Sequence, residues 1–435
     1  MKVGLIAMSG VRVRNPELAA LGVTLPQFVS RGKVIASLPS LGLLTVAGLT
    51  PEDCEIEYRE LADLPGEKDE LERFDLVGIS SFTAQIDEAY RLADRYRDAG
   101  VPVVLGGLHV SLQPEEAAEH ADCVVLNGAE GAWPQVVRDF RASRMRPRYE
   151  GLRSGVFEEQ AYARPRFDLL EGRAYNRVTV QTSRGCPLDC EFCAASLRIT
   201  ASFQQKPVDK VVAEIRAALA VVERPFFELA DDNTFINKKW GKEFLRALRP
   251  LGIRWFTETD VSVADDEELL DLLAESGCSQ VLIGFENPDA GGLEGLDPHN
   301  WKQRRAEGYL RAIDRIQSRG VSVNGCFILG LDSHDPGIFE RVRDFVARSG
   351  LLEVQVTVQT PFPGTPLYER LRREGRLLTE RYWDQCTLFD VTYRPKHMSV
   401  AELESGLRWL FSELYNAEEF TQRKRRYMEI VKQRL

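Results

Sequence analysis

Apolar and polar positions in the first 140 residues alternate between short hydrophobic runs and amphipathic stretches. The apolar runs predict strands at Val3–Ala7, Glu55–Tyr58, Leu76–Ser80, Val103–Leu105 and Cys123–Leu126. Between them, Ala84–Asp98 and Glu115–His120 have the spacing of amphipathic helices. Strands that alternate with helices pair in parallel, so the pattern predicts an α/β domain with a doubly wound parallel sheet over residues 1–140.

An irregular, Arg-rich segment at 141–176 is predicted to be a linker, and the alternation resumes after it. Strands are predicted at Val178–Thr182, Phe226–Leu229, Trp255–Glu258, Val281–Glu286, Val323–Leu329 and Val354–Gln359. Helices are predicted at Lys210–Val221, Lys238–Leu248, Asp265–Ser276, Arg304–Arg319, Ile338–Ser349 and Pro366–Glu374. Six repeats are too few for a closed eight-stranded barrel and predict a partial one over 177–378. Residues 379–435 are predicted to be mainly helical, with helices at Val400–Tyr415 and Ala417–Lys432.

Composition narrows the class of protein. A chain of 435 residues with 44% hydrophobic and 28% charged residues has the make-up of a globular protein of two or three domains. No apolar run reaches the length of a membrane span, and Met1–Met8 is too short for a signal peptide, so we expect a cytoplasmic location. The net charge of −10 argues against binding to nucleic acid.

Three of the eight cysteines lie within eight positions of one another. Cys186, Cys190 and Cys193 have the spacing C-x3-C-x2-C, in a segment whose Gly185 and Pro187 are typical of loops. Thiolates hold iron–sulfur clusters, usually through four ligands. Three cysteines on one loop would leave one iron of a four-iron cluster open to a substrate or cofactor.

A structural zinc site is the alternative interpretation of this loop. Zinc requires four ligands, usually cysteine or histidine near one another. No histidine lies between His120 and His299, and the next cysteine is Cys278. The spacing therefore favours a cluster over zinc.

The cysteine loop, with Phe192 directly before its third cysteine, resembles the signature of the radical S-adenosylmethionine (SAM) superfamily. The resemblance implies that Cys186, Cys190 and Cys193 hold a [4Fe-4S] cluster whose open iron binds the amino and carboxylate groups of SAM. It also implies a partial (β/α)6 barrel, and cleavage of SAM to a 5′-deoxyadenosyl radical that abstracts hydrogen from a substrate.

Further candidate SAM contacts are carried over from this resemblance. They are Phe192, Asp231, Asp232, Asn233, Glu258, Glu286, Asn324 and Gly330. Asp231-Asp232 departs from the Gly-Gly-Glu that is common in the family, and paired aspartates after a strand are also typical of a helix N-cap. The alternative role for Glu258 and Glu286 is a buried ion pair between strand ends.

Pro361–Pro366 (PFPGTP) and Gly106–His109 (GGLH) resemble a subgroup in which a cobalamin-binding domain precedes the radical SAM barrel. The candidate cobalamin contacts are Ser80, Ser81, Gly106, Gly107, His109, Asn127, Gly128 and Glu130. Tight strand-to-helix turns would use the same small residues, and His109 would equally suit packing at a turn. The Asp-x-His-x-x-Gly loop of many cobalamin proteins is absent, which fits both radical methyl transfer and a domain that has lost cobalamin.

The resemblance implies cobalamin-dependent methylation of a carbon in a small molecule or lipid, with flavodoxin or ferredoxin as the electron donor. The main alternative is a different radical reaction in natural-product biosynthesis, with or without cobalamin. That reaction would be a rearrangement, an oxidation, a ring closure or the insertion of a heteroatom such as sulfur. An RNA methylthiotransferase and a sensor that uses the cluster as a switch are more remote.

Overall fold

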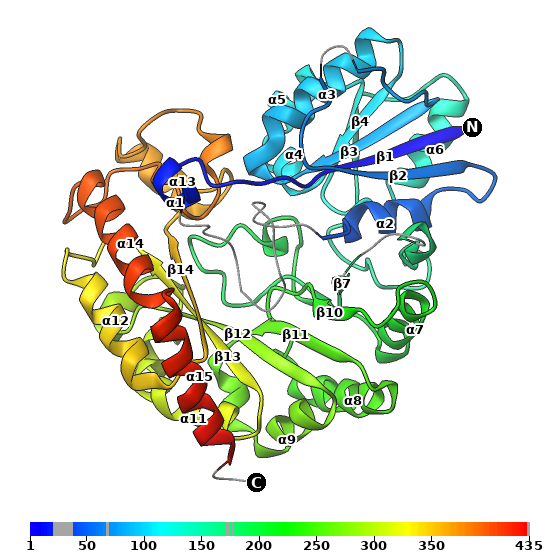
Figure 1. Ribbon diagram of the computed structural model, residues 1–435. Coiled ribbons are helices and arrows are strands. Elements are labelled where there is room, and N and C mark those ends of the chain that lie inside the picture. Colours follow the sequence, from blue (N-terminus) through cyan, green and yellow to red (C-terminus); the bar gives the residue numbers. More distant parts are fainter. Residues whose placement is uncertain (21–37, 67–68, 171–174, 176, 433–435) are drawn as a thin grey trace. The chain divides into compact units, whose positions relative to one another are not determined.

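The computed structural model describes residues 1–20, 38–66, 69–170, 175 and 177–432. The chain forms two compact units, one comprising Met1–Arg12, Val34–Gly185 and Ala194–Pro225, the other Val13–Lys33, Cys186–Cys193 and Phe226–Leu435 (Figure 1). Parts of the predicted linker and of the predicted C-terminal region, residues 171–174, 176 and 433–435, lie outside the described residues. The predicted domain boundaries after residues 140, 176 and 378 stay predictions. Within the described ranges, no helix has both the length and the apolar character needed to cross a membrane.

The first unit contains a six-stranded sheet of order β2-β1-β3-β4-β5-β6 in which every pair is parallel. Its strands are β1 (Lys2–Met8), β2 (Glu55–Leu61), β3 (Leu76–Ser81), β4 (Val103–Gly106), β5 (Cys123–Leu126) and β6 (Arg148–Glu150). Parallel strands need helical crossovers, which explains the alternation in the sequence. The predicted doubly wound sheet is confirmed.

Helices cover both faces of this sheet (Figure 1). They are α2 (Leu41–Leu49), α3 (Ile86–Asp98), α4 (Leu108–Leu112), α5 (Pro114–Glu119) and α6 (Trp133–Arg141). On one face, a Cβ added at Gly78 would lie 3.3 Å from the ring of Trp133, whose Nε1 donates to Thr50 Oγ1 at 2.8 Å. On the other, Phe74 packs against Gly4 and against Tyr96 of α3. Glycines in β1 and β3 thus make room for aromatic rings on opposite faces.

The strand order reverses direction at β1, because β2 lies on one side of β1 and β3 on the other. In open α/β sheets, ligands bind beyond the carboxyl ends of the strands at such a switch point. The carboxyl end of β3 carries Ser80 and Ser81, both half-buried. The topology therefore places two of the predicted cobalamin contacts at the expected edge of the sheet.

A second sheet has the order β14-β13-β12-β11-β10-β7. Its strands are β7 (Arg177–Val180), β10 (Phe226–Leu229), β11 (Arg254–Thr259), β12 (Cys278–Glu286), β13 (Ser322–Leu329) and β14 (Glu353–Val358). The pairs from β10 to β14 are parallel. A short antiparallel pair, β8 (Ser183–Arg184) with β9 (Gln204–Gln205), follows β7, and α7 (Val208–Leu219) follows β9. The predicted partial (β/α)6 barrel is confirmed.

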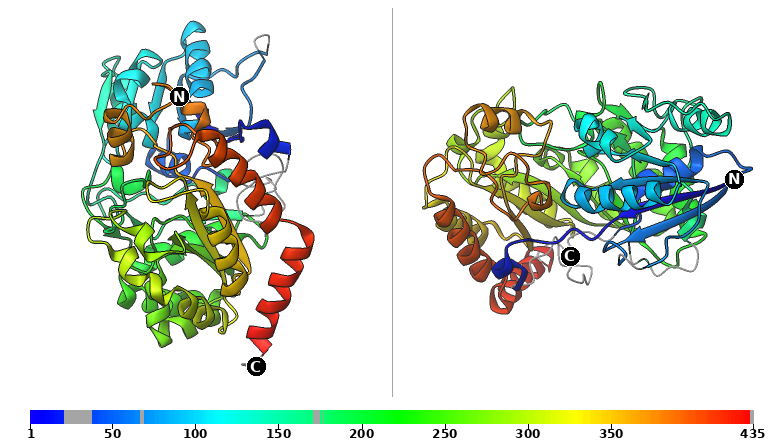
Figure 2. Two further views of the ribbon diagram at one scale, coloured as in Figure 1. Left: turned by 90° about the vertical axis from the view of Figure 1, so that its left-hand side faces the viewer. Right: turned by 90° about the horizontal axis from the view of Figure 1, so that it is seen from above.

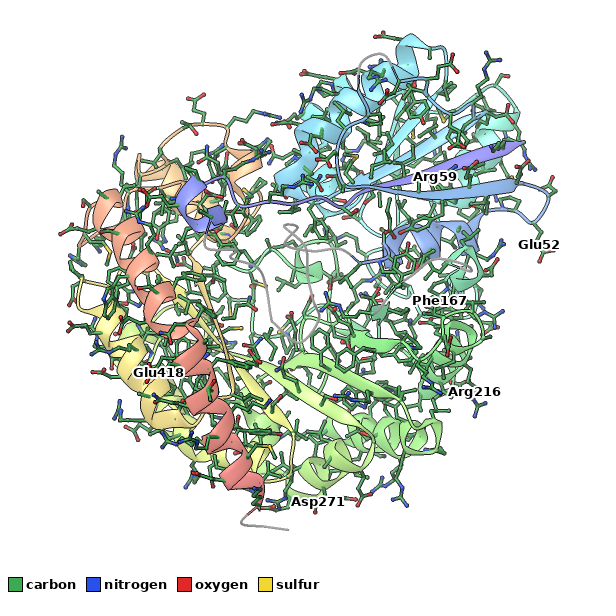
Figure 3. The ribbon with its side chains drawn as sticks, in the orientation of Figure 1. Glu52, Arg59, Phe167, Arg216, Asp271 and Glu418 are labelled. Atoms are coloured by element: carbon green, nitrogen blue, oxygen red, sulfur yellow. The ribbon has the colours of Figure 1, made fainter. Side chains whose placement is uncertain are left out.

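Helices pack on the outer face of the second sheet (Figures 1 and 2). They are α8 (Lys238–Leu248), α9 (Glu267–Glu275), α11 (Tyr309–Gln317) and α12 (Ile338–Ser349). The short helix α10 (Trp301–Arg305) precedes α11, and its Lys302 donates to the Gly284 carbonyl of β12. The ring of Phe285 contacts those of Tyr309 at 4.6 Å and Phe345 at 6.2 Å, which joins β12 to α11 and α12. Away from the sheet, Asp271 of α9 lies at the surface, where its carboxylate accepts from Arg319 (Figure 3). The single helix predicted at Arg304–Arg319 is instead split by a 3-10 turn at Ala306–Gly308.

The inner face of this sheet is polar. Side chains alternate between the two faces of a strand, so residues two positions apart share a face. Glu258, Leu282, Asn324 and Glu353 are register partners across four strands and form one row on the face opposite the helices. Gly284, Cys326 and Gln355 form the next row. A polar inner face and an apolar outer face are typical of a barrel that binds a polar ligand inside.

Three helices complete the second unit beyond β14: α13 (Pro366–Arg373), α14 (Val400–Leu414) and α15 (Ala417–Lys432). The short N-terminal helix α1 (Pro16–Ala20) belongs to the same unit. Thr365 caps α13 by accepting from the backbone N–H of Tyr368 at 3.2 Å, and Pro366 occupies its first turn. Ser399 and Glu402 form a capping box at α14.

Candidate functional site

The cysteine loop begins directly after β8 at a position that only glycine suits. Gly185 has φ +88°, and a Cβ there would lie 2.9 Å from Thr200 Oγ1. The Gly185 N–H donates to Ser196 Oγ at 2.8 Å. This turn sets the direction in which the chain enters the segment that carries the cysteines.

The three thiols lie on one loop and are not in disulfides. Cys190 is buried, Cys186 and Cys193 are half-buried, and the Cys193 N–H donates to the Cys190 carbonyl at 3.1 Å. Burial raises the pKa of the Cys190 thiol to about 12 and also raises the pKa of Cys186. The thiolate form required for metal binding therefore depends on the positive charge of the metal itself.

Zinc and cluster ligation make different geometric demands on these thiols. Zinc draws its ligands together onto one ion, whereas each cysteine of a [4Fe-4S] cluster binds a different iron. Among the described residues, no three Cys, His, Asp or Glu side chains converge on a single-metal position. Three cysteines on one loop suit the separate irons of a [4Fe-4S] cluster.

Glu258 has a strongly perturbed carboxyl group on the inner face. The side chain is accessible to solvent, but crowding by protein atoms, followed by the charges of Glu228, Asp232 and Asp231, raises its pKa to about 8. A carboxyl group held against like charges is stabilised by any positive group that binds beside it. Glu258 is therefore a candidate for the amino end of SAM.

Glu286 forms a buried ion pair, and its partner is a lysine of α10 and not a residue at the end of a neighbouring strand. Lys302 of α10 donates from Nζ to Glu286 Oε1 and to the Gly284 carbonyl, each at 2.8 Å, and both charged side chains are 8% exposed. Glu286 has φ +63°, an uncommon conformation that turns the chain at the end of β12. Burial lowers the pKa of Lys302, but the charges of Glu286 and Cys190 outweigh it and hold the pKa above its ordinary value.

The predicted residues after β10 have different environments. Asp231 is buried and accepts from Thr234 Oγ1 at 2.7 Å, so it acts as a local turn cap. Asn233 is buried and donates from Nδ2 to Asp260 at 2.8 Å, which joins the ends of β10 and β11. The charge of Asp232 contributes to the raised pKa of Cys186. Asp232 is therefore linked electrostatically to the cysteine loop.

Asn324 and Gly330 lie on and just after β13. Asn324 is fully buried, and neither polar atom of its side chain has a hydrogen-bond partner within the described part of the chain. Buried amides are normally satisfied, so this side chain has the capacity to bind a polar group that enters the barrel. Gly330 has φ +86°, and its carbonyl accepts from the Tyr393 hydroxyl at 2.5 Å. The backbone conformation at this position therefore explains the glycine without a contact to SAM. Phe192 is half-buried within the cysteine loop.

In the first unit, Ser80 and Gly107 lie side by side at the carboxyl ends of β3 and β4. A Cβ on Gly107, whose φ is +112°, would lie 2.8 Å from Ser80 Oγ. Gly106 ends β4. Phe82, 55% exposed, follows Ser81 and adds an apolar surface that the sequence analysis did not select. Small residues beside an exposed aromatic ring fit a large, flat ligand that approaches the backbone closely.

His109, Asn127 and Glu130 have partners inside the protein. His109 is buried, and its Nδ1 lies 3.2 Å from Thr83 Oγ1, which favours packing at a turn. Asn127 has φ +62° and donates from Nδ2 to Glu150 at 3.1 Å. Glu130 is buried and accepts two bonds from Arg184, at 3.1 and 3.2 Å. A Cβ on Gly128 would lie 2.5 Å from Glu130 Oε2, so this glycine makes room for the ion pair.

Three segments of the chain match described protein families. Residues 180–346 match the Radical SAM superfamily, and residues 31–137 match the B12 binding domain. The chain combines a radical SAM domain with a B12-binding domain. Residues 365–435 match a domain of unknown function, DUF4070. These matches confirm the family resemblance and make the chain a radical SAM enzyme whose cofactors are SAM, a [4Fe-4S] cluster and cobalamin.

Similar proteins span most of the chain. The bacteriochlorophyllide d C-12(1)-methyltransferase of Chlorobaculum tepidum is 26% identical over 89% of this chain and 84% of its own length. The hopanoid C-2 methylase of Rhodopseudomonas palustris is 26% identical over 79% and 66%. The radical SAM methyltransferase TsrM of Kitasatospora setae has a TM-score of 0.65 at 17% identity, covering 86% of this chain and 76% of TsrM. The cobalamin-dependent radical SAM enzyme OxsB gives 0.68 at 13%, covering 98% and 70%.

A bulky residue at Gly107 should weaken cobalamin binding to the B12-binding domain. Valine at Gly107 would meet Ser80 Oγ and strain the backbone, so we expect about tenfold weaker binding, equivalent to about 1.4 kcal/mol. The iron content of the radical SAM domain should not change. The measurement is cobalt retained per chain after reconstitution with hydroxocobalamin and gel filtration.

Gly100→Val is the matched control for this prediction. Gly100 also has a positive φ, +77°, but a Cβ there meets no atom within 4 Å, and the residue precedes β4 instead of following it. Both variants carry the backbone strain, while Gly107→Val alone fills the space beside Ser80. Equal cobalt content in the two variants would remove Gly107 from the proposed site.

Proposed function

We propose that the enzyme methylates a carbon atom of a small-molecule substrate with the use of cobalamin. The observation that carries the proposal is the pairing of two sites in one chain: a loop of three thiols suited to an open cluster, and small residues at the switch point of a B12-binding sheet. When bound, the cluster supplies the electron for SAM cleavage and cobalamin supplies a carrier for the methyl group. Similarity to carbon methyltransferases supports the same outcome.

The residues of this chain have separable roles in the proposal. Cys186, Cys190 and Cys193 hold the cluster. Glu258 accepts the amino group of SAM, and Asn324 offers an unpartnered amide inside the barrel. Asp232 and Phe192 remain proposed SAM contacts, whereas Asp231, Asn233, Glu286 and Gly330 act mainly on the shape of the strand ends.

The proposal also covers the electron donor, the location of the enzyme, its substrate class and its cobalamin contacts. A radical SAM enzyme requires a reductant, and we propose flavodoxin or ferredoxin for that role in the cytoplasm. The substrate is a small molecule and, by similarity to a hopanoid methylase, a lipid is one candidate class. Ser80, Ser81, Gly106 and Gly107 are the residues that we propose to contact cobalamin.

The stoichiometry of SAM products tests the proposal. Methylation uses one SAM as the methyl source and one for hydrogen abstraction, so S-adenosylhomocysteine and 5′-deoxyadenosine should form in equal amounts. Protein purified without oxygen, supplied with hydroxocobalamin and reductant, would be offered candidate methyl acceptors. Formation of 5′-deoxyadenosine without S-adenosylhomocysteine would contradict methylation and favour rearrangement, oxidation, ring closure or heteroatom insertion.

The affinity for SAM should rise with pH up to about pH 8, because the raised pKa of Glu258 leaves its carboxyl group largely protonated below that value. A bound ammonium group would favour the carboxylate, so SAM binding should release a proton near pH 7. Glu258→Gln should abolish this proton release and weaken binding about tenfold at pH 8, a loss typical of a charged hydrogen bond. Calorimetry of the cluster-loaded protein in buffers of different ionisation enthalpy measures the effect.

The carboxyl group of Glu258 should also make the folding stability depend on pH. Its folded pKa of about 8 exceeds its ordinary value of 4.5, so folding favours the neutral form. Stability therefore falls as the pH rises from about 4.5 to 8, and Glu258→Gln should reduce that fall. Asp271→Asn, which removes an exposed carboxylate on the outer surface of α9, is the control. An unchanged proton release in Glu258→Gln would exclude Glu258 from SAM binding.

A further inference from the structure

Glu191, the residue directly after Cys190, is held by three separate contacts. Its carboxylate accepts two bonds from Arg370, Nη2 to Oε1 at 2.7 Å and Nε to Oε2 at 3.1 Å. Its backbone N–H donates to the Leu296 carbonyl, and its carbonyl accepts from the Leu367 N–H, each at 3.0 Å. The short span between the second and third cysteines is therefore fixed by both its main chain and its side chain.

Arg370 also binds the segment that follows β13. Its Nη1 donates to Asp332 Oδ2 at 2.6 Å, and Arg376 donates to the other oxygen of Asp332 at 2.7 Å. Asp332 lies two residues after Gly330, whose carbonyl accepts from Tyr393. One guanidinium thus joins the cysteine loop to the end of β13, the strand that carries Asn324.

The position of Arg370 is set by its own helix. The helix α13 starts at the Thr365 cap with Pro366 in its first turn, and the Leu367 N–H that binds Glu191 lies in the same turn. Arg370, Arg376 and Tyr393 all belong to the segment that matches the domain of unknown function at 365–435. Two parallel bonds from a planar guanidinium fix the orientation of a carboxylate, which a lysine ammonium cannot do.

We propose that Arg370 is a positioning residue that holds the cysteine loop in the orientation needed for SAM cleavage, and that this clamp is one role of the segment at 365–435. The inference rests on the assignment of the loop to the cluster and not on methylation. Within the described part of the chain, Arg370 binds the carboxylates of Glu191, Asp332 and Glu374, and it acts on the cysteine loop through Glu191.

The test compares Arg370→Lys, Arg370→Met and Glu191→Gln with Arg372→Met. Arg372 lies on the same helix, is 60% exposed in its side chain and pairs with Glu369, so it serves as the matched control. The protein is the full chain with its cluster reconstituted. The readouts are iron content, the electron paramagnetic resonance spectrum of the reduced cluster with and without SAM, and kcat and KM for 5′-deoxyadenosine formation without a methyl acceptor.

We expect Arg370→Lys and Glu191→Gln to keep their iron, to change the spectral response to SAM, and to lower kcat about tenfold to a hundredfold, since small displacements of reacting groups have effects of this size. The double variant Arg370→Met/Glu191→Gln should be no worse than Arg370→Met, because both changes remove the same contact. Arg372→Met should match the unmodified enzyme.

Two results would overturn the proposal. One is an unaltered spectrum and kcat in Arg370→Lys and Glu191→Gln. The other is additive losses in the double variant, which would show that the two side chains act separately. If Arg370→Met does not fold, the two conservative variants still decide the question. Failure of methylation with normal 5′-deoxyadenosine formation would affect only the proposed function.

Discussion

Alanine at any one of Cys186, Cys190 or Cys193 is expected to remove the iron–sulfur cluster and all formation of 5′-deoxyadenosine. The loop carries three cysteines, so the loss of any one of them leaves the cluster with two thiolate ligands from this loop. Iron should fall from about four atoms per chain to near zero, together with the brown absorption of the cluster. Iron and sulfide analysis of anaerobically reconstituted protein measures the loss.

Cys54→Ala is the control for these variants. Cys54 is a half-buried cysteine of the first unit, where its sulfur accepts from Arg141 at 3.0 Å. It should keep a full complement of iron and normal SAM cleavage. Retention of the cluster in any of the three loop variants would refute the assignment of that cysteine.

Lys302→Met should be the most destabilising of the single changes considered. It leaves the Glu286 carboxylate buried without its cation, and breaking a buried ion pair in this way costs about 3–5 kcal/mol of unfolding free energy. Urea unfolding of the full chain, followed by far-ultraviolet circular dichroism, measures the change. If Glu286 acts instead as a SAM contact, Lys302→Met should lower the affinity for SAM without this loss of unfolding free energy.

The double variant Glu286→Gln/Lys302→Met separates the ion pair from the rest of the site. With both charges removed, no buried charge is left unpaired, so most of the lost stability should return. Lys242→Met removes a partly exposed surface lysine that pairs with Asp266 and Glu268 and should have little effect. If the double variant were as unstable as Lys302→Met, packing and not charge would be the cause.

Local patterns predicted most of the elements of both sheets. The strand Phe226–Leu229 and the helices Lys238–Leu248, Ile338–Ser349 and Ala417–Lys432 agree with the structure to the residue. Their periodicity and caps depend on neighbours in the chain, which is why sequence reasoning finds them. The helix α2, Leu41–Leu49, was missed because its continuous apolar run has no period that distinguishes a helix from a buried strand.

The roles of single site residues were harder to predict. The sequence analysis selected Glu130, Asp231 and Glu286 as ligand contacts, but each has a buried partner within the protein. Their partners Arg184 and Lys302 and the clamp residue Arg370 were not selected. No local signal identifies such pairs, because Glu130 and Arg184 are 54 residues apart and Glu191 and Arg370 are 179 apart.

The amino-acid sequence alone was enough for most of the strands and helices, because these depend on local periodicity. Its short motifs were enough, through their resemblance to known families, for the combination of a B12-binding domain with a radical SAM domain, and the three cluster ligands stay a prediction from the same motifs. The tertiary structure decided which carboxylates are free to meet a ligand and which are bound by a buried cation. That distinction arises from desolvation and from contacts between distant segments, and neither exists until the strands and helices have packed together.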